Sequence, residues 1–181
     1  MTALHRYEAS RDADLLMTHL WHQMDTGGDL DRIFADPTYP LSALLRVFAA
    51  PNETYYAYDD NGVWFACWFE LFAHGTFVSV WFRPDKRSSM ASATLFLRVL
   101  RAGIQAYGTV IAMSSHAHVP PFLDAMGFLH VGTIPRLLNG RDAGLWCISQ
   151  ATLDARLARP VDGTDRRAQA WRAAHEEIRR D

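Results

Sequence analysis

The spacing of apolar side chains changes along the chain, and each spacing predicts a different kind of element. Between residues 13 and 48, apolar positions recur every three or four residues, which predicts helices that Gly27-Gly28 and Pro37 interrupt. The next stretch is rich in β-branched and aromatic residues divided by turn signals, which is typical of antiparallel strands. We expect these strands at residues 54–58, 63–72 and 77–82, after a short first strand at residues 3–9.

Helices and strands alternate in the second half of the chain. Helical spacing over residues 89–106 is followed by expected strands at 109–113, 129–134 and 144–148, with a short helix at 120–126. This order predicts an α/β fold, in which helices flank a mixed, mostly antiparallel central sheet. Pro160 to Thr164 is typical of a linker, so we expect one domain over residues 1–159. A linker and a charged C-terminal helix would then occupy residues 160–181.

Composition, net charge and the positions of the cysteines restrict the classes of protein to which the chain can belong. The chain has 181 residues, of which 49% are hydrophobic and 21% charged, as in ordinary globular proteins. A net charge of −2 predicts no general attraction to nucleic acid or to anionic membranes. Cys67 and Cys147 both lie in apolar runs, which favours reduced, buried thiols. With no signal-peptide pattern and no apolar run that could span a bilayer, we expect a soluble, cytoplasmic protein.

The junction between the strand at 77–82 and the following helix is the most informative local feature. Pro84 turns the chain, and a run of small residues then leads directly into the helix. At such a junction, backbone N–H groups without partners and the positive end of the helix dipole face outward. The junction therefore predicts a site for an anionic group such as a phosphate.

Together with the next strand and Gly127-Phe128, this junction resembles the core of the GNAT superfamily of N-acetyltransferases, over about residues 54–149. The resemblance implies a GNAT-like fold, acetyl-CoA or another acyl-CoA as co-substrate, and transfer of the acyl group to an amine on a small molecule or protein. In the family, the loop pattern is Arg or Gln, two residues, Gly, one residue, then Gly or Ala, and its amides bind the pyrophosphate of coenzyme A. Here Arg87 matches the first position, Met90 replaces the first Gly, and Ser92 stands at the last position. The resemblance thus implies a degenerate coenzyme A site formed by Arg87, Ser88, Ser89, Met90, Ala91 and Ser92.

The residues that would move protons also depart from the family pattern. Leu123 stands where the family usually has a Tyr that protonates the departing thiolate, and an alkyl group cannot do this. His116 falls at the position of a usual Asn and, with His118, follows the strand where the sheet is expected to open, so it is a candidate acid or base. Glu70 interrupts an apolar strand, where burial would raise its pKa toward that of a useful base. Two other readings stay open: Glu70 at a solvated or Arg-paired strand end, and His116 as a simple loop residue.

A metal site is not expected. His116 and His118 are spaced as a possible ligand pair, but no Cys or carboxylate stands at a confirming spacing.

The same departures from the family pattern also fit a different functional class. Met90, Leu123 and the charged terminal helix are also compatible with a catalytically inactive GNAT fold that serves as an interaction or assembly protein. Such proteins include bacteriophage virion-associated components, and the terminal helix would then contact a protein partner or a second copy. A third possibility, intermediate between the acyltransferase and the assembly protein, is a sensor that binds acyl-CoA without turnover. Binding of acetyl-CoA separates the sensor and the enzyme from the assembly protein.

Overall fold

The fold is organised around one seven-stranded sheet. A computed structural model describes residues 3–8, 11–12, 16–49, 51–87, 89–158, 169, 172–174 and 176. The sheet has the order β1-β2-β3-β4-β5-β7-β6. Its strands are β1 (His5–Arg6), β2 (Glu53–Asp59), β3 (Gly62–Phe72), β4 (Gly75–Phe82), β5 (Thr109–Ser114), β6 (Leu129–Leu138) and β7 (Arg141–Ser149).

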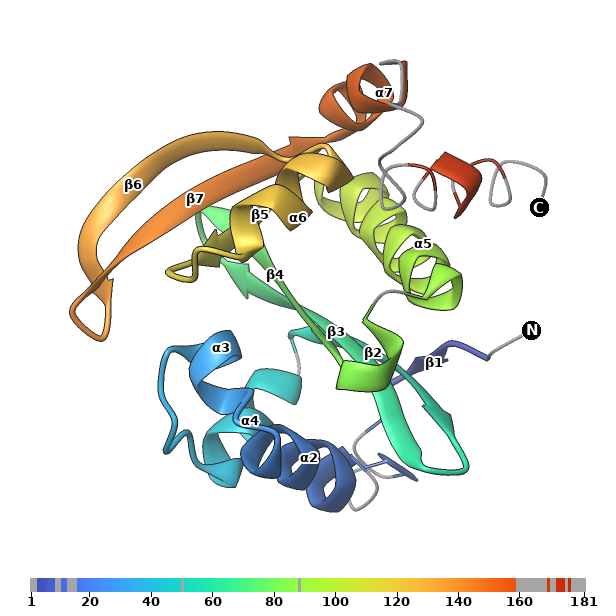
Figure 1. The fold of residues 1–181 in the computed structure, drawn as a ribbon, viewed down its shortest axis with the longest axis vertical. Helices are drawn as coiled ribbons and strands as arrows, with labels where there is room; N and C mark the ends of the chain where they lie inside the picture. Colours follow the sequence, from blue (N-terminus) through green and yellow to red (C-terminus); the bar gives the residue numbers. More distant parts are fainter. Residues whose placement is uncertain are drawn as a thin grey trace.

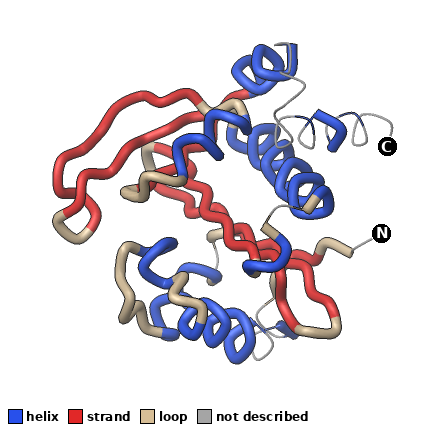
Figure 2. Tube along the Cα trace, viewed as in Figure 1, coloured by secondary structure: helices blue, strands red, loops and turns tan. Residues whose placement is uncertain are grey.

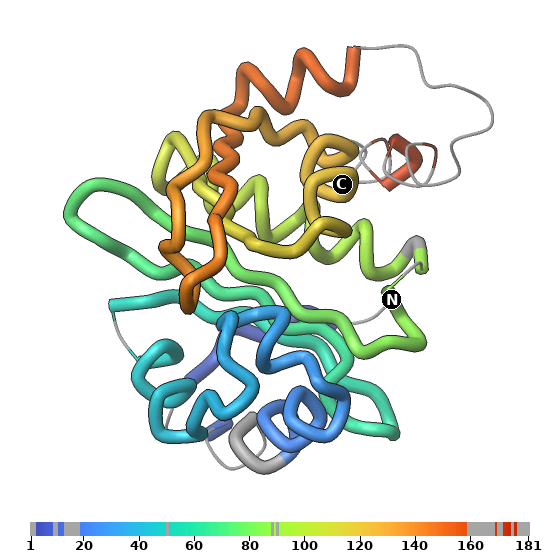
Figure 3. The backbone as a smooth tube through the Cα atoms, turned by 60° about the vertical axis from the view of Figure 1, so that its left-hand side comes forward, coloured from blue at the N-terminus to red at the C-terminus, as the bar shows by residue number. Residues whose placement is uncertain are grey.

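Helices cover both faces of the sheet. On one face lie a π-helix (Leu16–Trp21), α2 (His22–Thr26), α3 (Leu30–Phe34) and α4 (Leu41–Phe48); on the other lie α5 (Met90–Tyr107) and α6 (Val119–Met126) (Figures 1 and 2). A short 3-10 turn (Pro84–Lys86) precedes α5, and α7 (Gln150–Ala158) follows β7. The two layers of helices remain separated by the sheet when the molecule is turned (Figure 3).

The core has one part on each face of the sheet. Trp68 and Trp81 are buried with the N-terminal helices, whereas Phe69 and Phe96 are buried with α5. Residues 63–69 of β3 are buried without interruption, because both faces of this strand are covered. This burial explains why β3 has a continuous apolar run instead of an alternating pattern.

One pair of strands determines where the sheet opens. β4 and β5 are the parallel pair, and α5 forms the crossover between them. They pair only where Thr76 and Phe77 face Val110 and Ile111. The later part of β4 therefore separates from the end of β5 and leaves a gap within the sheet.

The β6–β7 hairpin reaches across to the N-terminal helices (Figure 1). At its tip Arg141 forms an ion pair with Asp31 of α3 at 2.5 Å, and the Asn139 side-chain amide donates to the carbonyl of Ala35. Arg136, with φ of 56°, lies where the pairing register of β6 shifts. This irregular stretch extends β6 four residues beyond the end expected from the sequence.

The α/β fold and the order of its elements are confirmed, with two differences. Helix α7 has no counterpart among the expected elements, and the first helical region contains a π-helix before α2. Of the expected C-terminal helix, only residues 169, 172–174 and 176 are described; Ala174 is fully buried in the core on the α5 face. Within the described chain, no helix is both long and apolar enough to cross a membrane.

Candidate active site

A cavity of about 790 Å³ lies where β4 and β5 separate. Its walls come from β4, the end of β5, α6 and α3. Because α3 and α6 lie on opposite faces of the sheet, the cavity has an α3 side and an α6 side (Figure 1). Most of the α6 side is apolar, with contributions from Val119, Phe122, Leu123 and Met126.

The start of α5 borders this cavity, and its serines are already hydrogen-bonded. Ser89 is the N-cap and accepts from the Ser92 amide at 3.1 Å. The Ser92 hydroxyl donates to the carbonyl of Lys86 at 2.6 Å and lies 2.8 Å from the Ser89 hydroxyl. Both hydroxyls therefore stabilise the turn before the helix. Ser88 and the Met90 side chain lie outside the described residues, and Ala91 is exposed in the first turn.

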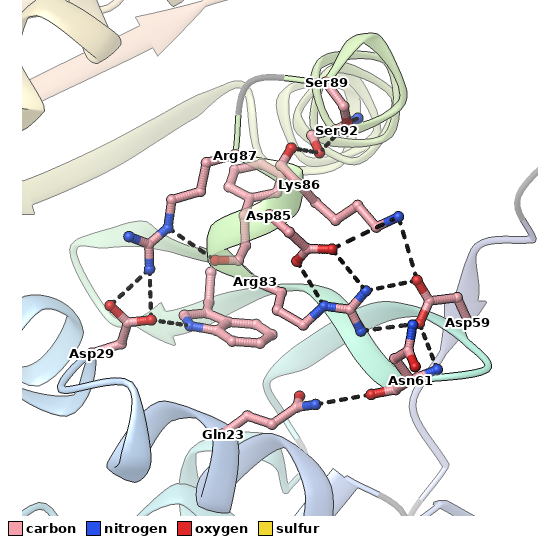
Figure 4. A network of polar contacts seen from close by, with 12 residues as sticks. Gln23, Asp29, Asp59, Asn61, Arg83, Asp85, Lys86, Arg87, Ser89 and Ser92 are labelled. Carbon is pink, nitrogen blue, oxygen red and sulfur yellow. Dashed lines mark hydrogen bonds and ion pairs between the residues drawn. The ribbon is translucent and has the colours of Figure 1, made fainter.

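Arg87 lines the cavity, but its guanidinium faces a carboxylate of the N-terminal helices (Figure 4). One terminal nitrogen lies 2.6 and 2.8 Å from the two oxygens of Asp29, and Nε donates to the carbonyl of Phe82 at 3.1 Å. Asp29 also accepts from Trp81 Nε1 at 2.8 Å, and its side chain is only 2% exposed. Arg87 thus links the loop before α5 to the layer that contains α3.

A second polar cluster fixes the other side of the same loop (Figure 4). Arg83 donates to both oxygens of Asp59, at 3.0 and 2.7 Å, and to Asp85 at 2.8 Å. The Arg83 guanidinium lowers the pKa of Asp59 to about 2. Lys86 approaches Asp59 at 3.5 Å, so the β2–β3 turn and the turn before α5 are held together by charge.

The two histidines after β5 differ in their surroundings. His116 Nε2 donates to the carbonyl of Asp31 at 3.1 Å, which joins the loop to α3. His118 lines the cavity, with its ring 5.6 Å from that of His116. Burial lowers the pKa of His118, and the positive charges of His116, Arg32 and Arg87 lower it further. These effects favour the neutral imidazole of His118, which is the form that can accept a proton.

The other two positions that the sequence singled out, Glu70 and Leu123, differ in their relation to the cavity. Glu70 lies near the end of β3 and accepts from Trp68 Nε1 at 3.3 Å; burial raises its pKa, but it is not part of the cavity wall. Leu123, at the family's Tyr position, is buried and lines the cavity.

The structure therefore brings Arg87, Ser89 and Ser92 to one cavity, while Glu70 lies outside its wall. Asp29 and Arg32 were missed by the sequence reasoning because their spacing along the chain indicates only a helix. Among the described residues, no three His, Cys, Asp or Glu side chains gather as a metal site.

Comparisons with known proteins identify the fold. No family model matches the sequence, and no curated protein matches it. The ribosomal-protein-S18-alanine N-acetyltransferase from Escherichia coli superimposes with a TM-score of 0.61 at 13% identity, covering 82% of this chain and 94% of that one. A probable GNAT-family acetyltransferase from Chromobacterium violaceum gives 0.65 at 15% identity, covering 83% and 84%.

A third similar structure contains a ligand. It is yncA from Salmonella typhimurium with its cofactor acetyl-CoA, with a TM-score of 0.62 at 12% identity, covering 91% of this chain and 99% of that one. Similarity at such low identity concerns the arrangement of the backbone. On that arrangement, the chain has the fold of the GNAT N-acetyltransferases.

Proposed function

We propose that this protein transfers an acyl group, most simply acetyl, from acyl-CoA to an amine. The observation that carries this proposal is the cavity between the separating strands β4 and β5, which borders the N-terminus of α5 and is lined by residues from both faces of the sheet. A thioester that enters from the α6 side and an amine that enters from the α3 side would meet at the gap. Such placement of two reactants is a large part of catalysis in bimolecular transfers.

The coenzyme would be held mainly by backbone groups. Beyond Phe77, β4 is no longer paired with β5, so its peptide groups on that edge are available to the amides of a pantetheine arm. At the start of α5, Ser89 already satisfies the Ser92 amide, which leaves the amides of Met90 and Ala91 as our candidates for the pyrophosphate. Arg87 would add positive charge from its position beside Asp29.

His118 is the group that we propose for proton transfer. The neutral amine attacks the thioester carbonyl carbon, a C–N bond forms, and the C–S bond breaks with its electron pair on sulfur. The proton lost by the amine passes to the neutral His118 imidazole, and from there to the coenzyme A thiolate. This route replaces the phenol that Leu123 cannot supply. His116 and Glu70 remain alternatives, although His116 is bonded to Asp31 and Glu70 lies outside the cavity wall.

A transfer assay tests the proposal. Release of free thiol from acetyl-CoA would be followed with a panel of amines, for wild-type protein and for His118→Gln, His116→Gln and Glu70→Gln. We expect His118→Gln to lower kcat by about 100-fold or more, with a much smaller effect of the other two. A loss confined to Glu70→Gln would instead assign the base to Glu70.

The same assay, with a titration of acetyl-CoA binding beside it, separates the enzyme from an assembly protein. If wild-type protein neither binds acetyl-CoA nor releases thiol with any amine, the transferase proposal fails, and an interaction role becomes the better explanation. Binding without release would indicate a sensor.

A further inference from the structure

The charged side chains that line the cavity carry more positive than negative charge. Its described lining contains Asp29, Arg32 and Arg87 as charged residues, that is, one carboxylate and two guanidinium groups. Asp31 also lies on α3, but it is paired with Arg141 at 2.5 Å, and its pKa is lowered by that partner. The α3 side of the cavity therefore carries an excess positive charge next to the gap where the amine would enter.

Arg32 is the source of this excess. Asp29 is already engaged by Arg87 at 2.6 Å and by Trp81 at 2.8 Å, whereas Arg32 reaches it through one nitrogen at 3.3 Å. The Arg32 side chain is 47% exposed, in contrast with the buried carboxylate. A guanidinium has several N–H donors in one plane, and in the part of the chain that the structure describes Arg32 uses one nitrogen, toward Asp29, which leaves the others to bind an anion.

We infer that Arg32 binds a carboxylate of the acceptor, and that the acceptor is an amino acid or a similar small molecule with an amine and a carboxylate. The inference rests on the proposed transferase function and names the substrate class of the same site. A guanidinium binds a carboxylate through two parallel hydrogen bonds, which fixes orientation as well as position. With its carboxylate held at α3, the acceptor would direct its amine toward the gap and His118. Trp81, Ile33 and Met113 line the same cavity and supply apolar contacts for a side chain.

A free phosphate group of coenzyme A is the other anion that could satisfy Arg32. The two possible anions, a carboxylate of the acceptor and a phosphate of coenzyme A, predict different kinetic effects when the contact with Arg32 is lost. Loss of a carboxylate contact raises KM for the acceptor alone, whereas loss of a phosphate contact raises KM for acetyl-CoA.

The test compares the proteinogenic L-amino acids with their carboxamides as acceptors, using thiol release from acetyl-CoA. We expect the free acids to be preferred over the amides by about 10-fold or more in kcat/KM. Arg32→Gln should remove this preference by raising KM for the acid about 10- to 100-fold, with KM for acetyl-CoA unchanged. Arg46→Gln, which alters an arginine of α4 outside the cavity wall, is the matched control and should leave both constants unchanged.

Equal use of amides, or an Arg32→Gln effect on acetyl-CoA alone, would overturn the inference. A binding measurement makes the result independent of turnover. In the presence of coenzyme A, N-acetyl amino acids are titrated into wild-type and Arg32→Gln protein beside their N-acetyl amides. Tighter binding of the acids to wild type, lost in Arg32→Gln, supports the inference, and equal binding of acid and amide contradicts it. Failure of the transferase proposal itself would instead appear as no binding of acetyl-CoA, or as binding of acetyl-CoA without release of thiol with any amine.

Discussion

At the scale of single residues, one buried carboxylate organises the cations around the cavity. Asp29 accepts hydrogen bonds from Arg87, Trp81 and, more weakly, Arg32. A carboxylate this deeply buried requires charged partners, because removing it from water without them is strongly unfavourable. Arg87 therefore has a structural contribution besides any contact with coenzyme A.

Arg87→Ala is expected to lower the free energy of unfolding by roughly 1–3 kcal/mol, because Asp29 would keep Trp81 but lose its strongest charged partner. The Arg87 side chain is 36% exposed, so solvent moderates the effect relative to a fully buried pair. Urea unfolding of wild type and variant measures the difference, with Arg101→Ala on α5 as a control. A change below about 0.5 kcal/mol would show that Arg87 is dispensable for stability.

At the scale of elements, the position of α5 depends on its packing and on the charged turn before it. Gly103 of α5 lies so close to β3 that an added Cβ would collide with the Phe69 ring. Phe69 is fully buried, and in a close-packed interior a ring has little room to move aside.

We therefore expect Gly103→Ala to destabilise the protein by about 1–3 kcal/mol, although alanine is the better helix former. Thermal and urea unfolding of the variant would check this. Stability equal to or above that of wild type would mean that α5 and β3 are farther apart than described.

The Arg83 cluster gives a pH-dependent prediction. Since the pKa of Asp59 falls from 3.8 to about 2 on folding, its stabilising contribution is present above pH 3.8 and is lost as the pH falls toward 2. Asp59→Asn should lower the free energy of unfolding by roughly 1–2 kcal/mol at pH 7, and by progressively less between pH 4 and pH 2. If the difference in the free energy of unfolding between wild type and Asp59→Asn stays constant from pH 4 to pH 2, the negative charge of Asp59 does not contribute to stability.

The elements also show what the sequence can and cannot predict. Strands β3 and β4 and helix α5 were predictable because the apolar pattern there is long and regular. Helix α7 has a weak apolar pattern, with Leu153 its single fully buried side chain, so sequence offers little signal for it. The proposed role of Arg32 depends on α3 lining the same cavity as the end of β5, which spacing along the chain does not indicate.

At the scale of the whole molecule, the central feature is a sheet divided by a gap. Pairing of β4 with β5 at two positions keeps the halves together, and the charged contacts of Asp31 with Arg141 connect the β6–β7 hairpin to α3 on the other side. The cavity thus lies in a frame that these two connections hold together. This frame supports the proposal that two substrates meet in the gap.

The most direct test is isothermal titration of the wild-type protein with acetyl-CoA, beside Val80→Trp, which fills the cavity from β4 on the α6 side, and Ala151→Trp, an exposed control on α7. We predict saturable binding to wild type and control, with a dissociation constant on the order of micromolar, and weaker binding to Val80→Trp. The ligand should also raise the unfolding temperature of wild type. Absence of heat at millimolar acetyl-CoA, together with an unchanged unfolding temperature, would contradict an acyl-CoA site between β4 and β5.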